Sequence, residues 1–180
     1  PVAGNGPEAF THLRRAARGM GRLPMMYKCS ARRAMAARKS GWRMIHIADE
    51  AVIDLAGFDI DLPARRTLRR KLRAAQKAGV TIRQGQPLPA VAMARVDHAW
   101  QARHGRAKGG SMGRYSTEYV QDQWVGCAYV GGHLVAFVTA HKAAGEWCLD
   151  IMRHDTAMPD GTMHALVHAA ITAAHTAGAA

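Results

Sequence analysis

Apolar residues form three short runs in the second half of the chain, separated by small turn-forming residues. The runs cover residues 124–130, 134–140 and 146–152. Gly131-Gly132 separates the first two, and a pair of glycines between β-rich runs is typical of a hairpin turn. Ala143-Ala144-Gly145 separates the second from the third. The pattern predicts an antiparallel meander that leads into a helix opened by Pro159-Asp160-Gly161.

Elsewhere apolar residues recur at helical spacing, with proline, serine or glycine at the ends of the periodic segments. Helices are predicted over residues 7–20, 31–39, 64–78, 89–103 and 117–123. Short strands are predicted at residues 25–29, 42–47 and 80–83, and residues 51–55 continue the second of these as extended chain. The expected class is α/β of the α+β kind, with mixed or antiparallel sheets flanked by helices.

The order of elements suggests two related halves. Helices followed by strands occur once before residue 79 and again, more completely, after residue 88. The predicted halves are residues 1–84, which are basic and incomplete, and residues 85–180. The chain ends at Gly178-Ala179-Ala180, where a helix should lead into another strand. The second half is therefore expected to stop before its last strands.

Positive charge is concentrated in the first part of the chain. Residues 1–79 carry 17 Lys and Arg against 6 Asp and Glu, whereas residues 80–180 carry 8 against 7. A concentrated positive surface attracts polyanions, which here means tRNA, other RNA or DNA, or an anionic membrane leaflet. The alternative is that arginine-rich helices only keep the surface solvated.

The helix predicted at residues 64–78 contains seven basic residues and no acidic ones. Like charges four positions apart on a helix repel by a few tenths of a kcal/mol per pair, and a bound anion would relieve that repulsion. A solvated helix face is the alternative, although such faces usually mix in acidic residues. The candidate residues for tRNA or anion binding are Arg65, Arg66, Arg69, Arg70, Arg73 and Lys77, with Lys71 beside them.

Cysteines and apolar runs indicate the compartment. The three cysteines, Cys29, Cys127 and Cys148, lack C-x-x-C spacing, so neither a disulfide framework nor a zinc site is expected. His164, His168 and His175 lie near one helix face, but an H-x-x-x-H pair that lacks the zincin Glu and a third ligand favours packing over a metal site. No run approaches the ~18 apolar residues of a membrane span, and no signal peptide is visible. We expect a cytoplasmic protein, peripheral at the inner face of the membrane if it binds lipid.

Six segments occur here in the same order as in the C-terminal domain of phosphatidylglycerol lysyltransferases, which this chain resembles from about residue 10 to residue 178. They are Glu50–Leu55, Arg65–Arg70, Ser111–Tyr115 with Tyr119 after it, Leu134–Phe137, Asp150–Arg153 and Pro159–Met163. The resemblance implies tandem acyltransferase folds of the GNAT type. It also implies transfer of a lysyl or alanyl group from charged tRNA to the glycerol headgroup of phosphatidylglycerol, without a cofactor.

An aminoacyl-tRNA is already an activated ester. The protein need only position it, accept a proton from the acceptor hydroxyl and stabilise the oxyanion. Asp150 or Glu146 is the candidate base, or the ligand of the aminoacyl ammonium group. Arg153 and Arg114 are candidates for holding phosphate or developing negative charge. Asp150 and Arg153 could instead form an ion pair with each other at the strand end.

Two further groups are candidates for substrate binding. Residues 104–115 form a loop with four glycines and basic side chains, in which Lys108, Arg114 and Tyr115 could bind a substrate phosphate. A flexible solvated loop is the alternative. Asp160 could contact substrate, but it also stands where an N-terminal helix cap is expected.

Two rival functions remain open at the level of sequence. A CoA-dependent N-acetyltransferase would use the same fold, but its pyrophosphate motif, [RQ]-x-x-G-x-[GA], is not matched at Arg153–Thr162. A binding module for nucleic acid or an anionic membrane would need the basic half and not the acids at the strand end.

Overall fold

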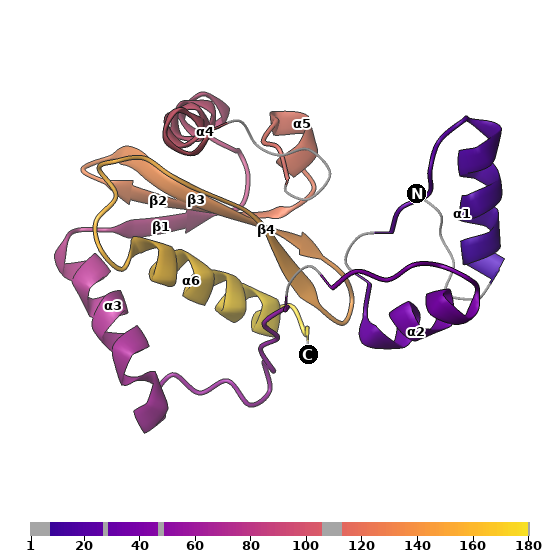
Figure 1. Ribbon diagram of the computed structural model, residues 1–180. Coiled ribbons are helices and arrows are strands. Elements are labelled where there is room, and N and C mark those ends of the chain that lie inside the picture. Colours follow the sequence, from indigo (N-terminus) through magenta and orange to yellow (C-terminus); the bar gives the residue numbers. More distant parts are fainter. Residues whose placement is uncertain (1–7, 27–28, 47–48, 106–112, 180) are drawn as a thin grey trace. The chain divides into compact units, whose positions relative to one another are not determined.

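The computed structural model describes residues 8–26, 29–46, 49–105 and 113–179 (Figure 1). The chain divides into two compact units, Pro1–Ala51 and Val52–Ala180. Helices and one antiparallel sheet make up the regular structure of the described residues, which confirms the α+β class. The boundary predicted at residue 84, between two GNAT-like halves, stays a prediction, because compactness does not report whether two segments are related.

The first unit consists of two helices held by an aromatic contact. Helix α1 (Glu8–Gly19) buries Phe10, whose ring lies 6.1 Å from that of Trp42. Arg14 lies 5.3 Å over the Trp42 ring and donates to the Ser40 carbonyl at 3.0 Å. Helix α2 (Ala31–Lys39) begins after Ser30, whose hydroxyl accepts a hydrogen bond from the amide of Arg33. These contacts join the end of α2 to α1.

The strands predicted at residues 25–29 and 42–47 are wrong for the residues that the structure describes. No strand is assigned to residues 51–55 either, and their extended conformation stays a prediction. Residues 25, 26, 29 and 42–46 are irregular, and Leu55 lies in a bend. A β-rich run becomes a strand only when a neighbouring strand satisfies its backbone groups. In the described part of the chain, no strand pairs with these runs.

The second unit contains a four-stranded sheet in the order β1-β2-β3-β4, with every pair antiparallel. The strands are β1 (Thr81–Gln84), β2 (Trp124–Val130), β3 (His133–Lys142) and β4 (Trp147–His154). Val130 pairs with His133 across the predicted two-glycine turn. Gly131 and Gly132 both have positive φ, as this hairpin turn requires. The predicted meander is therefore confirmed, and β1 adds a fourth strand.

Helices cover both faces of the sheet (Figure 1). Helix α4 (Ala90–His104) and the single-turn α5 (Thr117–Val120) lie on one face, where Met93 and Val96 pack on Phe137 and Ile151. Helix α6 (Thr162–Thr176) covers the other face with Leu166. Helix α3 (Arg66–Lys77), preceded by the 3₁₀ turn Pro63–Arg65, packs on α6. The helices predicted from periodicity are thus confirmed, within a few residues at their ends.

Gly161 lies where the start of α6 packs closely against the backbone of α3. Its φ is 83°, and a β-carbon at this position would collide with the backbone carbonyl of Lys71. Because Gly161 itself occupies the capping position of α6, the expected helix cap at Asp160 is wrong. The Asp160 carboxylate instead accepts hydrogen bonds from Lys71 at 2.7 and 2.9 Å. That hydrogen bond lowers the pKa of Asp160.

Candidate active site

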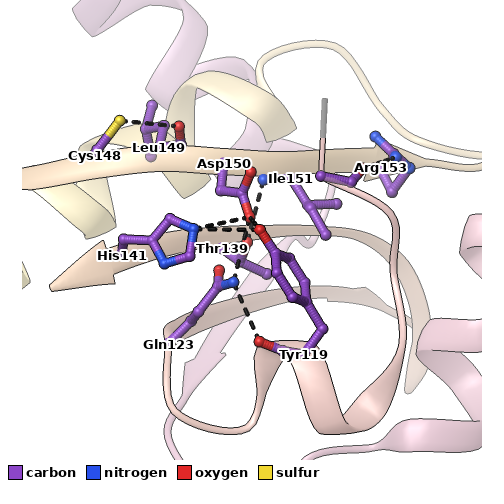
Figure 2. A network of polar contacts seen from close by, with 10 residues as sticks. Tyr119, Gln123, Thr139, His141, Cys148, Leu149, Asp150, Ile151 and Arg153 are labelled. Atoms are coloured by element: carbon purple, nitrogen blue, oxygen red, sulfur yellow. Dashed lines mark hydrogen bonds and ion pairs between the residues drawn. The ribbon is translucent and has the colours of Figure 1, made fainter. Parts of the chain in front are cut away.

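A network of polar contacts surrounds the Asp150 carboxylate on β4 (Figure 2). The Tyr119 hydroxyl donates to Asp150 Oδ2 at 2.8 Å, and Gln123 Nε2 donates to the same oxygen at 3.3 Å. Gln123 Nε2 also donates to the Tyr119 carbonyl. The side chain of Asp150 keeps 14% of its surface exposed, so the carboxylate is held in place yet reachable.

A β-bulge aims Asp150 toward this network. Val138 pairs with Met152 and Ala140 with Leu149, so Asp150 and Ile151 together lie opposite the single residue Thr139. The Thr139 hydroxyl accepts the Ile151 amide at 3.1 Å. Bulges of this kind often redirect a side chain near a functional site. Here the bulge brings the carboxylate within reach of α5.

The short helix α5 supplies the donors. Ser116 caps it by accepting a hydrogen bond from the Tyr119 amide at 3.2 Å. Tyr119 and Gln123 are four residues apart, and the chain then enters β2 at Trp124. Gln123 is buried, and its Oε1 has no hydrogen-bond partner among the described residues.

His141 joins the network from the end of β3. Its Nε2 lies 3.3 Å from Asp150 Oδ2 and 3.3 Å from the Tyr119 hydroxyl, and 54% of the side chain is exposed. Because the Tyr119 hydroxyl donates its hydrogen to Asp150, its oxygen is left to accept from His141, which selects the tautomer with hydrogen on Nε2. That tautomer leaves Nδ1 as a proton acceptor. Asp150 and His141 therefore have the arrangement of an oriented general base.

Tyr119 is held in its phenol form. Burial raises the pKa of Tyr119, and the hydrogen bond that it donates to Asp150 raises it further. The hydroxyl therefore remains a donor to Asp150 across the neutral pH range. It fixes the carboxylate next to His141.

Arg153 is enclosed in the core instead of facing the network. It is 2% exposed, and its Nε donates to Asp97 Oδ1 at 2.7 Å. Its guanidinium lies 3.9 Å over the Trp100 ring and donates to the Gly113 carbonyl at 3.2 Å. The alternative of an ion pair between Asp150 and Arg153 is thus wrong, because Arg153 pairs with Asp97 of α4 instead. The geometry is that of a buried structural lock, and a catalytic role for Arg153 stays a prediction.

The structure describes the predicted substrate loop at residues 104–105 and from Gly113 onward, so Lys108 lies outside the described residues. A β-carbon on Gly113 would be 2.6 Å from Asp150 Oδ1, so the backbone here closes over the carboxylate. Arg114 is exposed next to it. Tyr115 donates to the Ala90 carbonyl at 3.2 Å and packs on Phe137. Burial raises the pKa of Tyr115, whose contacts are those of a packing residue.

Glu146 is exposed in the turn between β3 and β4, where its carbonyl accepts the Ala143 amide. Glu146 is four positions before Asp150, and four positions correspond to about 13 Å along an extended strand. The structure therefore does not bring Glu146 into the Asp150 network.

The basic residues of α3 divide into two sets. Arg69 donates to the carbonyls of Ile60 and Leu62, and Lys71 pairs with Asp160, so these side chains have internal acceptors. Exposed residues form the other set, which we call the α3 basic face: Arg66, Arg70, Arg73 and Lys77. Only this second set is available for tRNA or another polyanion.

Sequence reasoning missed His141, Gln123 and Asp97 as members of these clusters. His141 ends an apolar run and Gln123 precedes one, and polar residues at strand ends are the signal that could have found them. Within the described residues, no three His, Cys, Asp or Glu side chains converge as metal ligands. None of the described helices has the length and apolar character needed to span a bilayer.

A family comparison decides what kind of protein carries this network. The family described as phosphatidylglycerol lysyltransferase, C-terminal, matches residues 1–180. The chain belongs to this family. The resemblance carried by the six sequence segments is thereby confirmed, and the relatives of the chain include transferases of lipid modification.

Among its relatives is the lysylphosphatidylglycerol biosynthesis bifunctional protein LysX of Mycolicibacterium vanbaalenii. It is 28% identical over 168 residues, which is 89% of this chain and 15% of that protein. The C-terminal domain of a protein assigned as a lysylphosphatidylglycerol synthetase in Agrobacterium fabrum has the same fold, with a TM-score of 0.83 and 24% identity. L-PGS from Bacillus licheniformis gives a TM-score of 0.82 and 25% identity.

Coverage of these relatives is partial. The chain is matched over 96% of its own length but spans 57% of each of the two solved chains. The fold common to the family is therefore established for this chain, together with membership of the lysyltransferase family.

Proposed function

We propose that the chain transfers an aminoacyl group, of the lysyl or alanyl type, from charged tRNA to the headgroup of phosphatidylglycerol. Family membership supports the lipid acceptor. The observation that carries the proposal is the Asp150 carboxylate, which Tyr119 and Gln123 hold against an exposed His141. This is the arrangement that removal of a proton from a glycerol hydroxyl requires.

In the proposed reaction His141 Nδ1 accepts the proton of the headgroup hydroxyl, and Asp150 stabilises the imidazolium that results. The hydroxyl oxygen forms a bond to the aminoacyl carbonyl carbon. When the tetrahedral intermediate collapses, the bond from that carbon to the tRNA ribose oxygen breaks, and His141 returns the proton to the departing oxygen. Protons and bonds balance without a cofactor.

The α3 basic face is the proposed binding surface for the tRNA backbone. It carries four exposed cations that repel one another. Contacts with the phosphates of a nucleic-acid backbone would relieve this repulsion. The protein would work at the inner face of the membrane, where both charged tRNA and anionic lipid are within reach.

Packing at the start of α6 favours this donor over acetyl-CoA. A pyrophosphate binds where backbone amides at a helix N-terminus are open. At α6 the backbone of Gly161 lies directly against the Lys71 carbonyl, and the CoA motif is absent from the sequence. Both observations argue against CoA as the acyl carrier.

The test follows labelled amino acid from a mixed pool of charged tRNAs into chloroform-extractable lipid, with phosphatidylglycerol vesicles as acceptor. We expect label in the lipid, with His141→Gln lowering kcat by about 10²- to 10⁴-fold as expected for loss of a general base. His133→Gln, at the exposed first residue of β3, is the matched control and should leave kcat unchanged.

The variants also separate the two roles open to Asp150. Loss of kcat with unchanged KM in Asp150→Asn supports orientation of the base. A raised KM for charged tRNA with unchanged kcat would show that Asp150 binds the ammonium group. The role of Asp150 in orienting the base would then be dropped from this proposal. Vesicles that acquire no label while all tRNAs stay charged would overturn the function itself.

A further inference from the structure

An apolar groove opens on the outer side of α6, between that helix, the start of α3 and the segment that precedes α3. Its volume is about 280 Å³. Apolar side chains make up most of its walls: Ile53, Phe58, Leu68, Met163, Val167 and Ile171. Three of these lie on α6, from Met163 to Ile171, which corresponds to about 12 Å of helix. The groove is therefore long enough for an extended hydrocarbon segment.

Arg65 provides the polar element of the groove. Its guanidinium lies 4.3 Å over the Phe58 ring, which holds the side chain against the groove wall. Arg65 Nε is buried and has no hydrogen-bond partner among the described residues. Arg65 also lines the groove, so its guanidinium is the cation within reach of an anionic oxygen of a ligand bound there.

The α3 side of the groove is cationic, whereas the segment before α3 carries Asp54, Asp59 and Asp61. Arg66 and Arg70 of the α3 basic face lie one and five positions after Arg65, and His164 and His168 contribute to the α6 wall. Cations beside an apolar slot complement a molecule with an anionic head and a hydrocarbon chain. An anionic leaflet attracts such a surface, by about 1 kcal/mol for each Lys or Arg close to it in general.

We infer that the groove binds one acyl chain of an anionic phospholipid, with the lipid phosphate on Arg65, and so docks this unit on the membrane. The groove is formed by α6 and α3, whereas Tyr119 of the Asp150 network belongs to α5 on the opposite face of the sheet (Figure 1). The bound lipid is therefore an anchor and not the acceptor that reacts. The inference stands whether or not aminoacyl transfer is the activity of the chain.

The experiment is calorimetric titration of the chain with dihexanoyl- and dioctanoyl-phosphatidylglycerol, both below their critical micelle concentrations. Burying two additional methylenes of one chain should tighten binding about fifteenfold. Glycerophosphoglycerol, which has no chains, should not bind measurably. Dihexanoyl-phosphatidylcholine should bind more weakly than the anionic lipid, because its headgroup carries no net negative charge.

Two variants, each with a matched control, locate the site. Val167→Trp fills the groove and should weaken both anionic lipids by about tenfold or more, whereas Val91→Trp on the exposed side of α4 should not. Arg65→Gln should remove the preference for phosphatidylglycerol over phosphatidylcholine, and Arg103→Gln should keep it. Thermal unfolding of each variant shows whether it is folded.

Three results would overturn the inference. Equal affinity for the two chain lengths would mean that no chain is buried, and unchanged binding by Val167→Trp would place the lipid elsewhere. Absence of binding by any monomeric lipid would leave a polypeptide segment as the occupant of the groove. Because none of these titrations requires charged tRNA or turnover, their outcome is separate from that of the transferase assay.

Discussion

The buried pair of Arg153 and Asp97 allows a quantitative prediction. Both residues are almost inaccessible, with exposures of 2% and 5%, and they are joined at 2.7 Å. Arg153→Met removes this ion pair and the donor to the Gly113 carbonyl, and it leaves a carboxylate buried with Gln101 as its remaining donor. Removing one member of a buried pair generally costs about 3–5 kcal/mol. We expect the free energy of unfolding to fall by that amount.

The matched comparison replaces both members of the pair. In Asp97→Leu/Arg153→Met no buried charge is left alone, so the double variant should recover most of the stability. Urea denaturation followed by tryptophan fluorescence gives the four free energies of the cycle. A cost below about 1 kcal/mol for Arg153→Met alone would refute the assignment of Arg153 as a buried lock. Transferase activity of the double variant then tests the predicted catalytic role, because a lock can be replaced by apolar packing and a catalytic cation cannot.

Three further outcomes follow from single positions. Gly161→Ala should cost about 2–4 kcal/mol in urea denaturation, from positive φ and collision with the Lys71 carbonyl, whereas Gly178→Ala, with positive φ but open space around it, should cost less. Lys71 lowers the pKa of Asp160 in the folded protein. Asp160→Asn should therefore lower the melting temperature at neutral pH. This difference from the parent protein should disappear as the pH falls below about 4, the usual pKa range of a carboxyl group. Cys127, whose pKa burial raises to about 11, should resist alkylation at pH 7.5 until urea unfolds the chain, as read by mass spectrometry.

Local signals account for the part of the fold that the sequence predicts well. The two glycines at 131 and 132 determine a hairpin because only their backbone adopts the required positive φ without strain. The amphipathic helices carry their own start and stop residues, such as Ser30 before α2 and Gly79 after α3. Each of these features depends on a few neighbouring residues, and each is visible before any tertiary contact is known.

Tertiary contacts account for the errors. The runs at 25–29 and 42–47 have β-forming composition, but a strand forms only with a partner strand, which can come from any part of the chain. The partner of Arg153 is 56 residues away in sequence, and the acceptor of Lys71 is 89 residues away. Spacing within a motif does not reveal contacts with residues that are distant in sequence. The motif alone therefore predicts a helix cap at Asp160 and allows an ion pair between Arg153 and Asp150.

Asp150 and Arg153 show most clearly why a motif can locate a site without assigning its chemistry. The two residues are three positions apart on β4. Asp150 and Ile151 form the bulge opposite Thr139, and Arg153 lies two positions beyond it. Asp150 consequently faces α5 with an exposed histidine beside it, whereas Arg153 turns into the core against Trp100. A variant of Arg153 should then lose activity in proportion to lost folding, and stabilising the fold should restore it. A variant of His141 should lose turnover at full stability, because its exposed ring contributes little to the core. If both variants lost activity and stability in the same proportion, the division of this strand end into a lock and a reactive group would be wrong.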